Sequence, residues 1–362
     1  MSPATPSLEP PFGNRDAGGM AALVEAIPDH IEQALARTES APWQLPVRAP
    51  ELVAVGGMGG SAIAAELTGA LWADVMPRPW LVVRDYHWPA CVGPRSLAVL
   101  SSNSGNTEET LALEREAAER GVPCVGLSSG GQLADRLHAA GSHCQAVPSG
   151  MPPRAALFHA WVPMTRLVSA LGWVPDPGPA WREAAVQSRA RLAELGAQVP
   201  ESANPAKRLA RACHGRLIMV YAASGPMAAV ALRMRQQLHE NAKLLGHSAA
   251  VPELNHNEIV GWQAPGALHR SISVLVLRDR EDSAELTTRL DLTAEYAVRQ
   301  GAAVHEIRTV GESRIARLAS VVQFGDHLSL HLALLGGVDP TDITSIDEFK
   351  RRLSEHTPPR TR

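Results

Sequence analysis

The sequence predicts an α/β protein of two doubly wound domains, each built on a mainly parallel sheet flanked by helices. Three observations predict this class. Short apolar runs alternate with amphipathic stretches, two early runs end in turns rich in glycine and serine, and the alternation returns in the second half. A chain of 362 residues with 45% hydrophobic side chains is long enough for about two globular domains.

The first half of the chain alternates four apolar runs with helical patterns. Strands are expected at residues 52–55, 80–83, 97–100 and 123–127. Helices are expected at residues 21–37, 62–71, 111–120, 155–171 and 180–195. Strands that alternate with helices indicate parallel pairing with both faces of the sheet covered. We expect an N-terminal domain at residues 1–150 and a helical connection at 151–205.

The second half repeats this plan. Strands are expected at residues 217–222, 272–277 and 304–307. Helices are expected at residues 227–245, 284–300, 314–322, 326–335 and 345–353. The C-terminal domain is therefore expected at residues 206–362, with a helix at its end.

Composition narrows the class of protein. A formal net charge of -3 gives no indication of a nucleic-acid partner. The best apolar stretch, residues 217–232, is interrupted by Ser224, Gly225 and Pro226, so no membrane span is expected. The first residues lack the pattern of a signal peptide. The four cysteines form no CxxC pair, which indicates free thiols in a cytoplasmic protein and no zinc site.

The most informative segment is the polar turn at residues 101–110, between an apolar run and a helical pattern. The start of a helix carries unpaired N–H groups and the positive end of its dipole. Hydroxyls from Ser102, Ser104 and Thr107 would complete a pocket for a phosphate. Asn106 is expected to cap the helix.

A second turn, rich in glycine, admits two interpretations. Gly57, Gly59 and Ala62 match a GxGxxA dinucleotide fingerprint, with Asp85 placed to meet a ribose, which would indicate a dinucleotide-dependent oxidoreductase. Alternatively, Gly60 and Ser61 join the hydroxyl-rich turn around one small phosphate at the carboxyl ends of neighbouring strands. We favour the monophosphate, because dinucleotide binding does not need the hydroxyl cluster.

The two turns together resemble a sugar isomerase (SIS) domain. Further segments resemble the bifunctional phosphoglucose/phosphomannose isomerases, over about residues 20–355. These segments are Pro152-Pro-Arg154-Ala, Glu240-Asn-Ala-Lys243, Pro252-Glu-Leu-Asn-His256-Asn-Glu-Ile-Val-Gly-Trp262 and Asp347-Glu-Phe-Lys350. One position departs from the family pattern, since Asn103 stands where the family often has an aromatic residue.

The resemblance implies a hexose 6-phosphate substrate and assigns roles to four side chains. Glu240 would be the catalytic base, and Arg154 would stabilise the enediolate. His256 would open the sugar ring with help from Lys350, and it would come from the other subunit of a homodimer. No cofactor or metal is expected, because Arg154 supplies the positive charge.

Two alternatives stay open at this point. The chain could be a non-catalytic sugar-phosphate-binding SIS module, or the oxidoreductase described above. Only three of the 34 basic residues are lysines. This scarcity favours the interpretation that each remaining lysine is needed for its compact ammonium group, which the planar guanidinium of arginine does not replace. Lys350 is assigned to ring opening, whereas Lys207 and Lys243 are expected to be structural.

Overall fold

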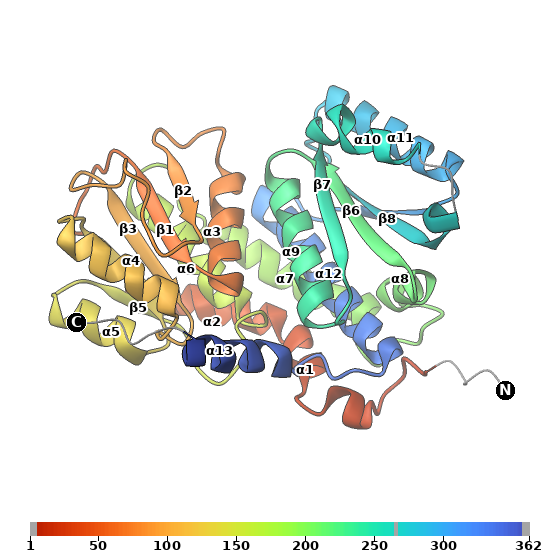
Figure 1. Ribbon diagram of the computed structural model, residues 1–362, viewed down its shortest axis with the longest axis horizontal. Coiled ribbons are helices and arrows are strands. Elements are labelled where there is room, and N and C mark those ends of the chain that lie inside the picture. The colour runs from red at the N-terminus through yellow and green to blue at the C-terminus, as the bar shows by residue number, and fades with distance from the viewer. Residues whose placement is uncertain (1–5, 264–266, 357–362) are drawn as a thin grey trace.

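The computed structural model describes residues 6–263 and 267–356, and two parallel sheets organise the chain (Figure 1). The N-terminal sheet has the strand order β2-β1-β3-β4-β5. Its strands are β1 (Val53–Gly57), β2 (Trp80–Val83), β3 (Leu97–Ser102), β4 (Cys124–Ser128) and β5 (Cys144–Ala146). Every neighbouring pair is parallel, so the loops that follow β1 and β3 meet at one edge of the sheet.

Helices cover both faces of this sheet. The helices α4 (Glu108–Glu119) and α5 (Gly131–Ala139) pack on one face through a separate apolar cluster. The other face meets α3 (Gly59–Leu71) and α6 (Leu157–Ala170), backed by α2 (Ile27–Ser40). The predicted doubly wound class is therefore confirmed for this half.

The C-terminal sheet repeats the arrangement with four parallel strands in the order β7-β6-β8-β9. The strands are β6 (Leu217–Ala223), β7 (Gly246–Val251), β8 (Ile272–Arg278) and β9 (Ala303–Arg308). One face packs on α11 (Ala284–Arg299), and the other meets α8 (Pro205–Cys213), α9 (Pro226–Glu240) and α12 (Arg314–Gly336). The first strand of each half thus lies second in its sheet.

The helix α12 is the central element of the molecule. It has 23 residues, and those from Ile315 to Leu335 are all buried. It contacts α7 (Gly178–Leu195), α8 and α9. It also contacts α1 (Met20–Glu25), from the N-terminal part of the chain. Although α12 has the length and hydropathy of a membrane span, its apolar window lies entirely inside the protein. The two helices expected at 314–322 and 326–335 are therefore one core helix.

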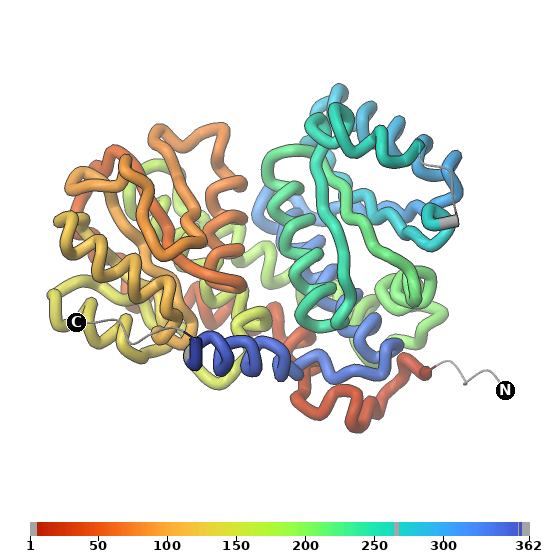
Figure 2. The backbone as a smooth tube through the Cα atoms, viewed as in Figure 1, coloured from red at the N-terminus to blue at the C-terminus, as the bar shows by residue number. Residues whose placement is uncertain are grey.

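The path of the chain brings an N-terminal segment beside the end of α12 (Figure 2). Arg15, in the short helix η1 (Gly13–Asp16), donates a hydrogen bond to the carbonyl of Leu334 at 3.1 Å. The remaining elements follow β7 or end the chain. They are η2 (Glu253–His256), α10 (Glu258–Gly261), η3 (Ala267–Ser271) and α13 (Thr344–His356).

Antiparallel packing of α3 on α9 determines where the two domains meet. The carbonyl of Pro153, beside the start of α3 at Gly60, precedes Arg154, which reaches the end of α9 at Glu240. At the opposite end, a cavity of about 990 Å³ is lined by Gly69 of α3 and Gly225 at the start of α9. The carboxyl ends of the two sheets therefore point in opposite directions.

Candidate active site

The glycine turn after β1 is needed for close backbone packing. A Cβ atom on Gly57 would lie 2.8 Å from the carbonyl oxygen of Ser101, on β3. A Cβ atom on Gly60 would lie 2.8 Å from the carbonyl oxygen of Pro153. Real Cβ atoms almost never approach this closely, so both glycines permit contacts that a side chain would block. The first turn of α3 thereby rests directly on the segment that carries Arg154.

The polar turn after β3 lies opposite. The Oγ of Ser102, which is buried, lies 2.8 Å from the Oγ1 of Thr107 and accepts a hydrogen bond from the Gly105 N–H at 3.1 Å. Ser104 is exposed. A pocket between the two turns is lined by Gly60, Ser61, Ser101, Asn103, Leu127, Val147, Pro153, Ala156 and Ala160. The two turns therefore share one pocket, and Asn103 faces it in the position where the sequence departs from the family pattern.

Asn106 does not cap α4, so this expectation is wrong. Its amide donates to the carbonyl of Ser104 at 3.2 Å, and its Oδ1 accepts from the N–H of Gln132 at 3.2 Å. These contacts tie the turn to α5 and leave no atom of Asn106 for the helix. Within residues 6–263 and 267–356, no side chain caps α3 or α4. Free N–H groups at a helix start attract anions.

The side chain of Arg154 is buried and held in place by several polar contacts. It is 2% exposed, and its Nε donates to the Oδ1 of Asn241 at 2.7 Å. Its Nη2 donates to the carbonyl of Pro340. Its Nη1 lies 3.6 Å from the Oε2 of Glu240, whose side chain is 30% exposed. The structure thus brings together Arg154 and Glu240, the two residues to which the resemblance assigns the enediolate contact and the catalytic base.

A buried polar network fixes this pair from behind. Arg233 donates to the backbone carbonyl of Arg154 at 2.7 Å and forms an ion pair with Asp326 at 3.1 Å. The Nδ2 of Asn241 donates to the Oγ of Ser329 at 3.0 Å. Burial raises the pKa of Asp326, and the ion pair with Arg233 opposes that rise. Arg233 comes from α9, Asn241 caps the end of α9, and Asp326 and Ser329 come from α12, so these two core helices help to set the position of Arg154.

Lys243, for which we expected a structural role only, lies next to Glu240 and Arg154. Its Nζ donates to the carbonyl of Glu240 at 2.7 Å and to that of Pro340 at 3.2 Å. Burial and the nearby Arg154 lower the pKa of Lys243. Among the described residues it is the one non-glycine residue with positive φ, 56°. The helix expected to reach Leu245 ends at Glu240 because the backbone turns into this conformation.

His256 lies far from Glu240 within one chain. Glu240 ends α9 shortly before β7 begins, whereas His256 lies in η2, after β7 has ended. The six residues of β7 span about 20 Å at roughly 3.3 Å per residue. His256 is exposed, and its ring has no hydrogen-bond partner in the part of the chain that the structure describes. The structure therefore does not bring the predicted base and ring-opening residue together.

Lys350 also stands apart from the Arg154–Glu240 pair. It lies on α13, which begins four residues after Pro340, and it is exposed. No ion pair or hydrogen bond of its Nζ joins it to another described residue. Its helix nevertheless leaves the body at the same edge as Arg154, because the Pro340 carbonyl binds that arginine.

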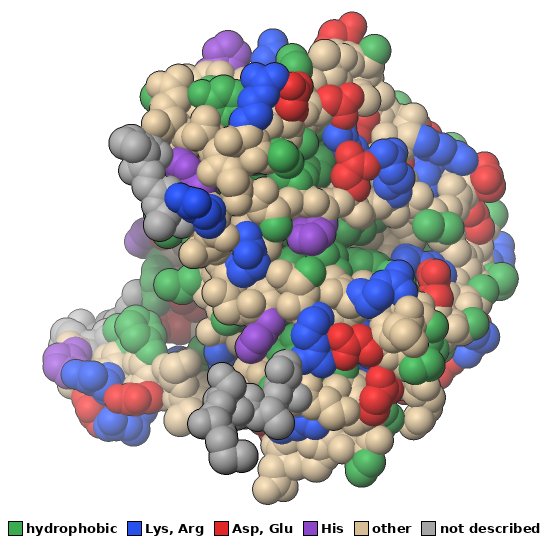
Figure 3. Space-filling model, turned by 90° about the vertical axis from the view of Figure 1, so that its right-hand side faces the viewer, with side chains coloured by type: hydrophobic (Ala, Val, Ile, Leu, Met, Phe, Trp, Pro, Cys, Tyr) green, Lys and Arg blue, Asp and Glu red, His purple; other side chains and the backbone are tan. Residues whose placement is uncertain are grey.

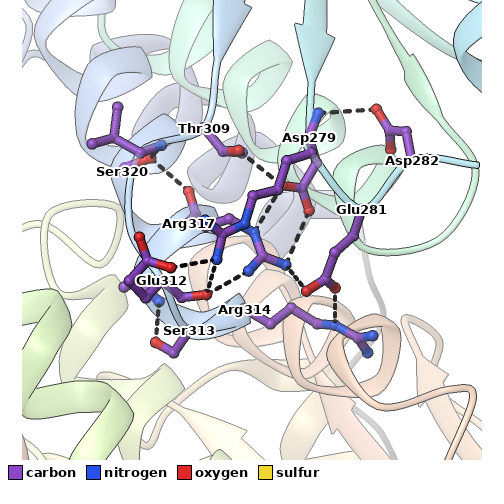
Figure 4. Close-up of polar contacts among 12 residues, drawn as sticks. Asp279, Glu281, Asp282, Thr309, Glu312, Ser313, Arg314, Arg317 and Ser320 are labelled. Carbon is purple, nitrogen blue, oxygen red and sulfur yellow. Dashed lines mark hydrogen bonds and ion pairs between the residues drawn. The ribbon is translucent and has the colours of Figure 1, made fainter.

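The C-terminal half fills the equivalent turn differently (Figure 4). The loop after β8 corresponds in strand order to the loop after β3, but it carries carboxylates in place of hydroxyls. Asp279 accepts from the Nε of Arg317 at 2.8 Å, and Glu281 pairs with the Nη2 of Arg317 at 2.6 Å. The side chains of Arg317 and Asp279 are 1% and 7% exposed. A phosphate entering this loop would meet the carboxylates of Asp279 and Glu281, whose negative charge is already paired with Arg317.

The same network fastens the domains to each other. Arg314 donates to the carbonyl of Leu71, at the end of α3, at 2.9 Å and pairs with Asp74 at 3.0 Å. Its Nε lies 3.1 Å from Glu281. The hydrogen bond from Arg314 lowers the pKa of Asp74. A polar clamp and a shared apolar core thus hold the site between two domains.

Comparisons with known proteins identify the family to which this chain belongs. Residues 202–353 match the family described as bacterial phospho-glucose isomerase C-terminal SIS domain. A bifunctional phosphoglucose/phosphomannose isomerase from Caldicellulosiruptor bescii is 34% identical over 330 residues, which cover 91% of this chain and 97% of the relative. The chain belongs to the bifunctional phosphoglucose/phosphomannose isomerase family. The family expected from the motifs is therefore confirmed.

Other relatives of this family member extend the comparison. A protein of the same name from Aquifex aeolicus is 30% identical, with 83% of this chain and 89% of that protein covered. Among solved structures, tagatose-6-phosphate ketose/aldose isomerase from Escherichia coli aligns with a TM-score of 0.70 at 14% identity, covering 90% of this chain and 95% of that one. That likeness concerns the fold alone, and it confirms the two-domain SIS architecture.

Proposed function

We propose that this chain is an aldose–ketose isomerase that interconverts glucose 6-phosphate and mannose 6-phosphate with fructose 6-phosphate. The observation that carries the proposal is the placement of buried Arg154 beside the Glu240 carboxylate. Pro153, the residue before Arg154, lines the pocket between the two uncapped helix starts. Proton transfer next to a carbonyl needs a carboxylate base and a cation for the developing negative charge.

The 6-phosphate would be held by the two turns. Gly60 and Ser61 would contribute from the start of α3, and Ser102, Ser104 and Thr107 from the turn before α4. Backbone N–H groups and hydroxyls at two neighbouring helix starts suit a dianion better than a neutral group. This anchor would place C1 and C2 of the open-chain sugar toward Glu240.

The chemistry would run through a cis-enediol(ate). Glu240 would take the proton from C2 of the aldose, and the electron pair of that bond would form the C1–C2 double bond. Arg154 would stabilise the negative charge on the oxygen. The proton of the O2 hydroxyl would move to O1, Glu240 would return its proton to C1, and the electron pair of the C1–C2 double bond would form the new C1–H bond as C2 becomes the carbonyl of the ketose. Rotation about C2–C3 in the enediol would present the opposite face, which connects the mannose epimer to the same intermediate.

Ring opening would need groups from outside the Arg154–Glu240 pair. Because His256 lies about one strand length, roughly 20 Å, from Glu240, we infer that the partner subunit's His256 enters the site of a homodimer. Imidazole exchanges protons readily near neutral pH, which suits transfer between ring oxygen and hydroxyl. Lys350 on α13 would assist. Four free cysteines fit a reducing, cytoplasmic location.

A proton-exchange experiment tests the assignment. The variant Glu240→Gln keeps the size of the side chain and removes the base, so it should lose exchange of the C2 proton with deuterated water by at least about 10³-fold. Binding of fructose 6-phosphate, followed by calorimetry, should stay nearly unchanged. Glu119→Gln, at an exposed position on α4, is the matched control. Turnover like that of the wild type in Glu240→Gln would overturn the role of Glu240.

The non-catalytic alternative predicts a different result. A sugar-phosphate sensor would bind fructose 6-phosphate without producing any aldose phosphate. An NMR time course with the purified wild-type chain distinguishes the two, because each aldose 6-phosphate has its own anomeric proton signals.

A further inference from the structure

His256 stands on a short turn whose neighbouring side chains are held by the protein. Leu254, two residues earlier, is buried. The Nδ2 of Asn255 donates to the Oγ1 of Thr293, on α11, at 2.8 Å. Histidine side chains reach the surface of the C-terminal domain (Figure 3), and that of His256 is exposed. The turn thus displays one imidazole while the residues before it are anchored.

The carboxylate of Glu258, two residues after His256, ties the turn to the sheet. Its Oε1 accepts from the hydroxyl of Tyr221, on β6, at 2.5 Å. Its Oε2 lies 2.8 Å from the Nε2 of His247, on β7. The Tyr221 hydroxyl also accepts from the Nε1 of Trp262 at 3.3 Å. Two neighbouring strands therefore engage the two oxygens of one carboxylate.

Burial makes this arrangement specific. Tyr221 is 0% exposed and Trp262 is 3% exposed. A buried hydroxyl without an acceptor is unfavourable, so Tyr221 favours the position of Glu258 that satisfies it. Burial and the hydrogen bond to Glu258 also raise the pKa of Tyr221, which keeps the hydroxyl protonated as a donor. The sheet thus determines where the carboxylate lies, and the carboxylate determines where the turn ends.

We propose that Glu258 is a positioning residue for ring opening, because Tyr221 and His247 hold its carboxylate and the carboxylate fixes the turn that carries His256. The inference rests on the proposed function, in which the imidazole of His256 moves protons during ring opening. Glu258 itself would not touch the sugar. It would act through the placement of the neighbouring histidine.

Ring opening of fructofuranose is sensitive to such placement. The bond between C2 and the ring oxygen O5 breaks, the anomeric hydroxyl loses its proton, and its electron pair forms the C2 carbonyl. The ring oxygen gains a proton. These transfers need the imidazole of His256 within hydrogen-bond reach of the sugar oxygens, so a loosened turn would slow them. Transfer of the proton between C1 and C2 is assigned to Glu240 and should not respond.

Two ketoses separate these steps. Fructose 6-phosphate must open before it isomerises. 5-Deoxyfructose 6-phosphate lacks the hydroxyl that closes the furanose ring, so it stays in the open-chain form and enters directly at proton transfer. The ratio of kcat for the first ketose to kcat for the second therefore reports ring opening, and a general loss of folded enzyme does not change it.

Three variants test the positioning role. Glu258→Ala removes both contacts and should lower the kcat ratio at least about tenfold. Glu258→Gln should keep the ratio within about threefold of the wild type, because its amide can accept from Tyr221 and donate to His247. Leu195→Ala, in the buried core at the end of α7, should reduce stability and leave the ratio unchanged. Equal losses with both ketoses in Glu258→Ala, or an equally large loss of the ratio in Glu258→Gln, overturn the proposal.

Amide hydrogen exchange measures the turn without turnover. The backbone N–H groups of Asn257 and Glu258 should exchange at least about tenfold faster in Glu258→Ala than in the wild type, and at the wild-type rate in Glu258→Gln. Unchanged exchange in Glu258→Ala overturns the inference. A wild type that turns over neither ketose would contradict the proposed function, and the exchange rates would still decide whether Glu258 holds the turn.

Discussion

Arg154 and Lys243 donate hydrogen bonds to the same backbone carbonyl, that of Pro340. Two cations on one oxygen repel each other, and the carboxylate of Glu240 beside Arg154 compensates for part of this repulsion. Lys243 also holds this place at the cost of a left-handed backbone, φ 56°. Backbone strain of this kind persists where the surroundings require it, often at functional sites.

Substitution of Lys243 should separate stability from activity. Lys243→Gly and Lys243→Ala both remove the Nζ contacts, but only glycine adopts positive φ without strain. The glycine variant should therefore be about 1 kcal/mol more stable to unfolding in urea than the alanine variant. Both should turn over more slowly than the wild type. Equal stability of the two variants would show that the backbone at this position relaxes without cost.

Gly60→Ala should damage the site more than the fold. The new methyl group would press on the carbonyl oxygen of Pro153, 2.8 Å away, and displace the segment that holds Arg154. We expect kcat/KM for fructose 6-phosphate to fall at least tenfold, about 1.4 kcal/mol in transition-state binding. Gly93→Ala is the control, because a Cβ atom there meets nothing within 4 Å. Similar losses in both variants would contradict the steric explanation.

Loss of Arg317 should be far more harmful than loss of Arg314. Arg317→Ala would leave the buried Asp279 carboxylate without its partner, which typically costs about 3–5 kcal/mol. Arg314 pairs with Asp74 at an exposed position, so Arg314→Ala should cost about 1 kcal/mol or less. Urea unfolding of both variants measures this difference. Comparable losses would mean that the clamp works through Arg314 and the domain contact.

Buried histidines should make the protein sensitive to acid. Burial lowers the pKa of His159 and of His327 to about 3. The folded state then keeps each ring neutral, while the unfolded chain takes up a proton below about pH 6.5. Between about pH 6.5 and 3 the unfolded state binds more protons, so stability falls as pH falls, by up to about 1.4 kcal/mol per pH unit for each histidine.

The variant His159→Phe checks this sign. Its free energy of unfolding, measured in urea at pH 7 and at pH 5, should decline less steeply than that of the wild type. The difference in slope should approach about one proton. A slope identical to that of the wild type would show that His159 takes up no proton on unfolding.

Sequence patterns predicted the continuously apolar strands well, including the edge strand β2, and missed strands whose apolar pattern is interrupted. The strand expected at 80–83 has those bounds as β2, because Trp80–Val83 is continuously apolar. By contrast, β7 at the sheet edge was not expected, since His247 and Ser248 interrupt its apolar pattern and one side of the strand pairs with nothing in the described sheet. Tertiary pairing decided this strand.

The sequence likewise predicted some parts of the candidate site and not others. Local sequence predicted the two turns at helix starts, because hydroxyls and glycines near strand ends have direct local consequences. Phosphate binding by these turns stays a prediction. The approach of Arg154 to Glu240 depends on how α9 packs against α3. The hydrophobic periodicity of either helix does not determine that packing. The family resemblance supplied that pair. The Pro340 carbonyl, which contacts both cations, had no sequence signal at all.

The first four strands of each half have the same spatial order, but the turn after the third strand carries hydroxyls in the first half and carboxylates in the second (Figure 4). In the first half this turn is the proposed site of the substrate phosphate. In the second, Asp279 and Glu281 occupy the comparable place as permanent, covalently attached anions. The repeated architecture thus uses one position in two ways: in the first half for a ligand that would come from solution, and in the second half for charges that the protein neutralises itself.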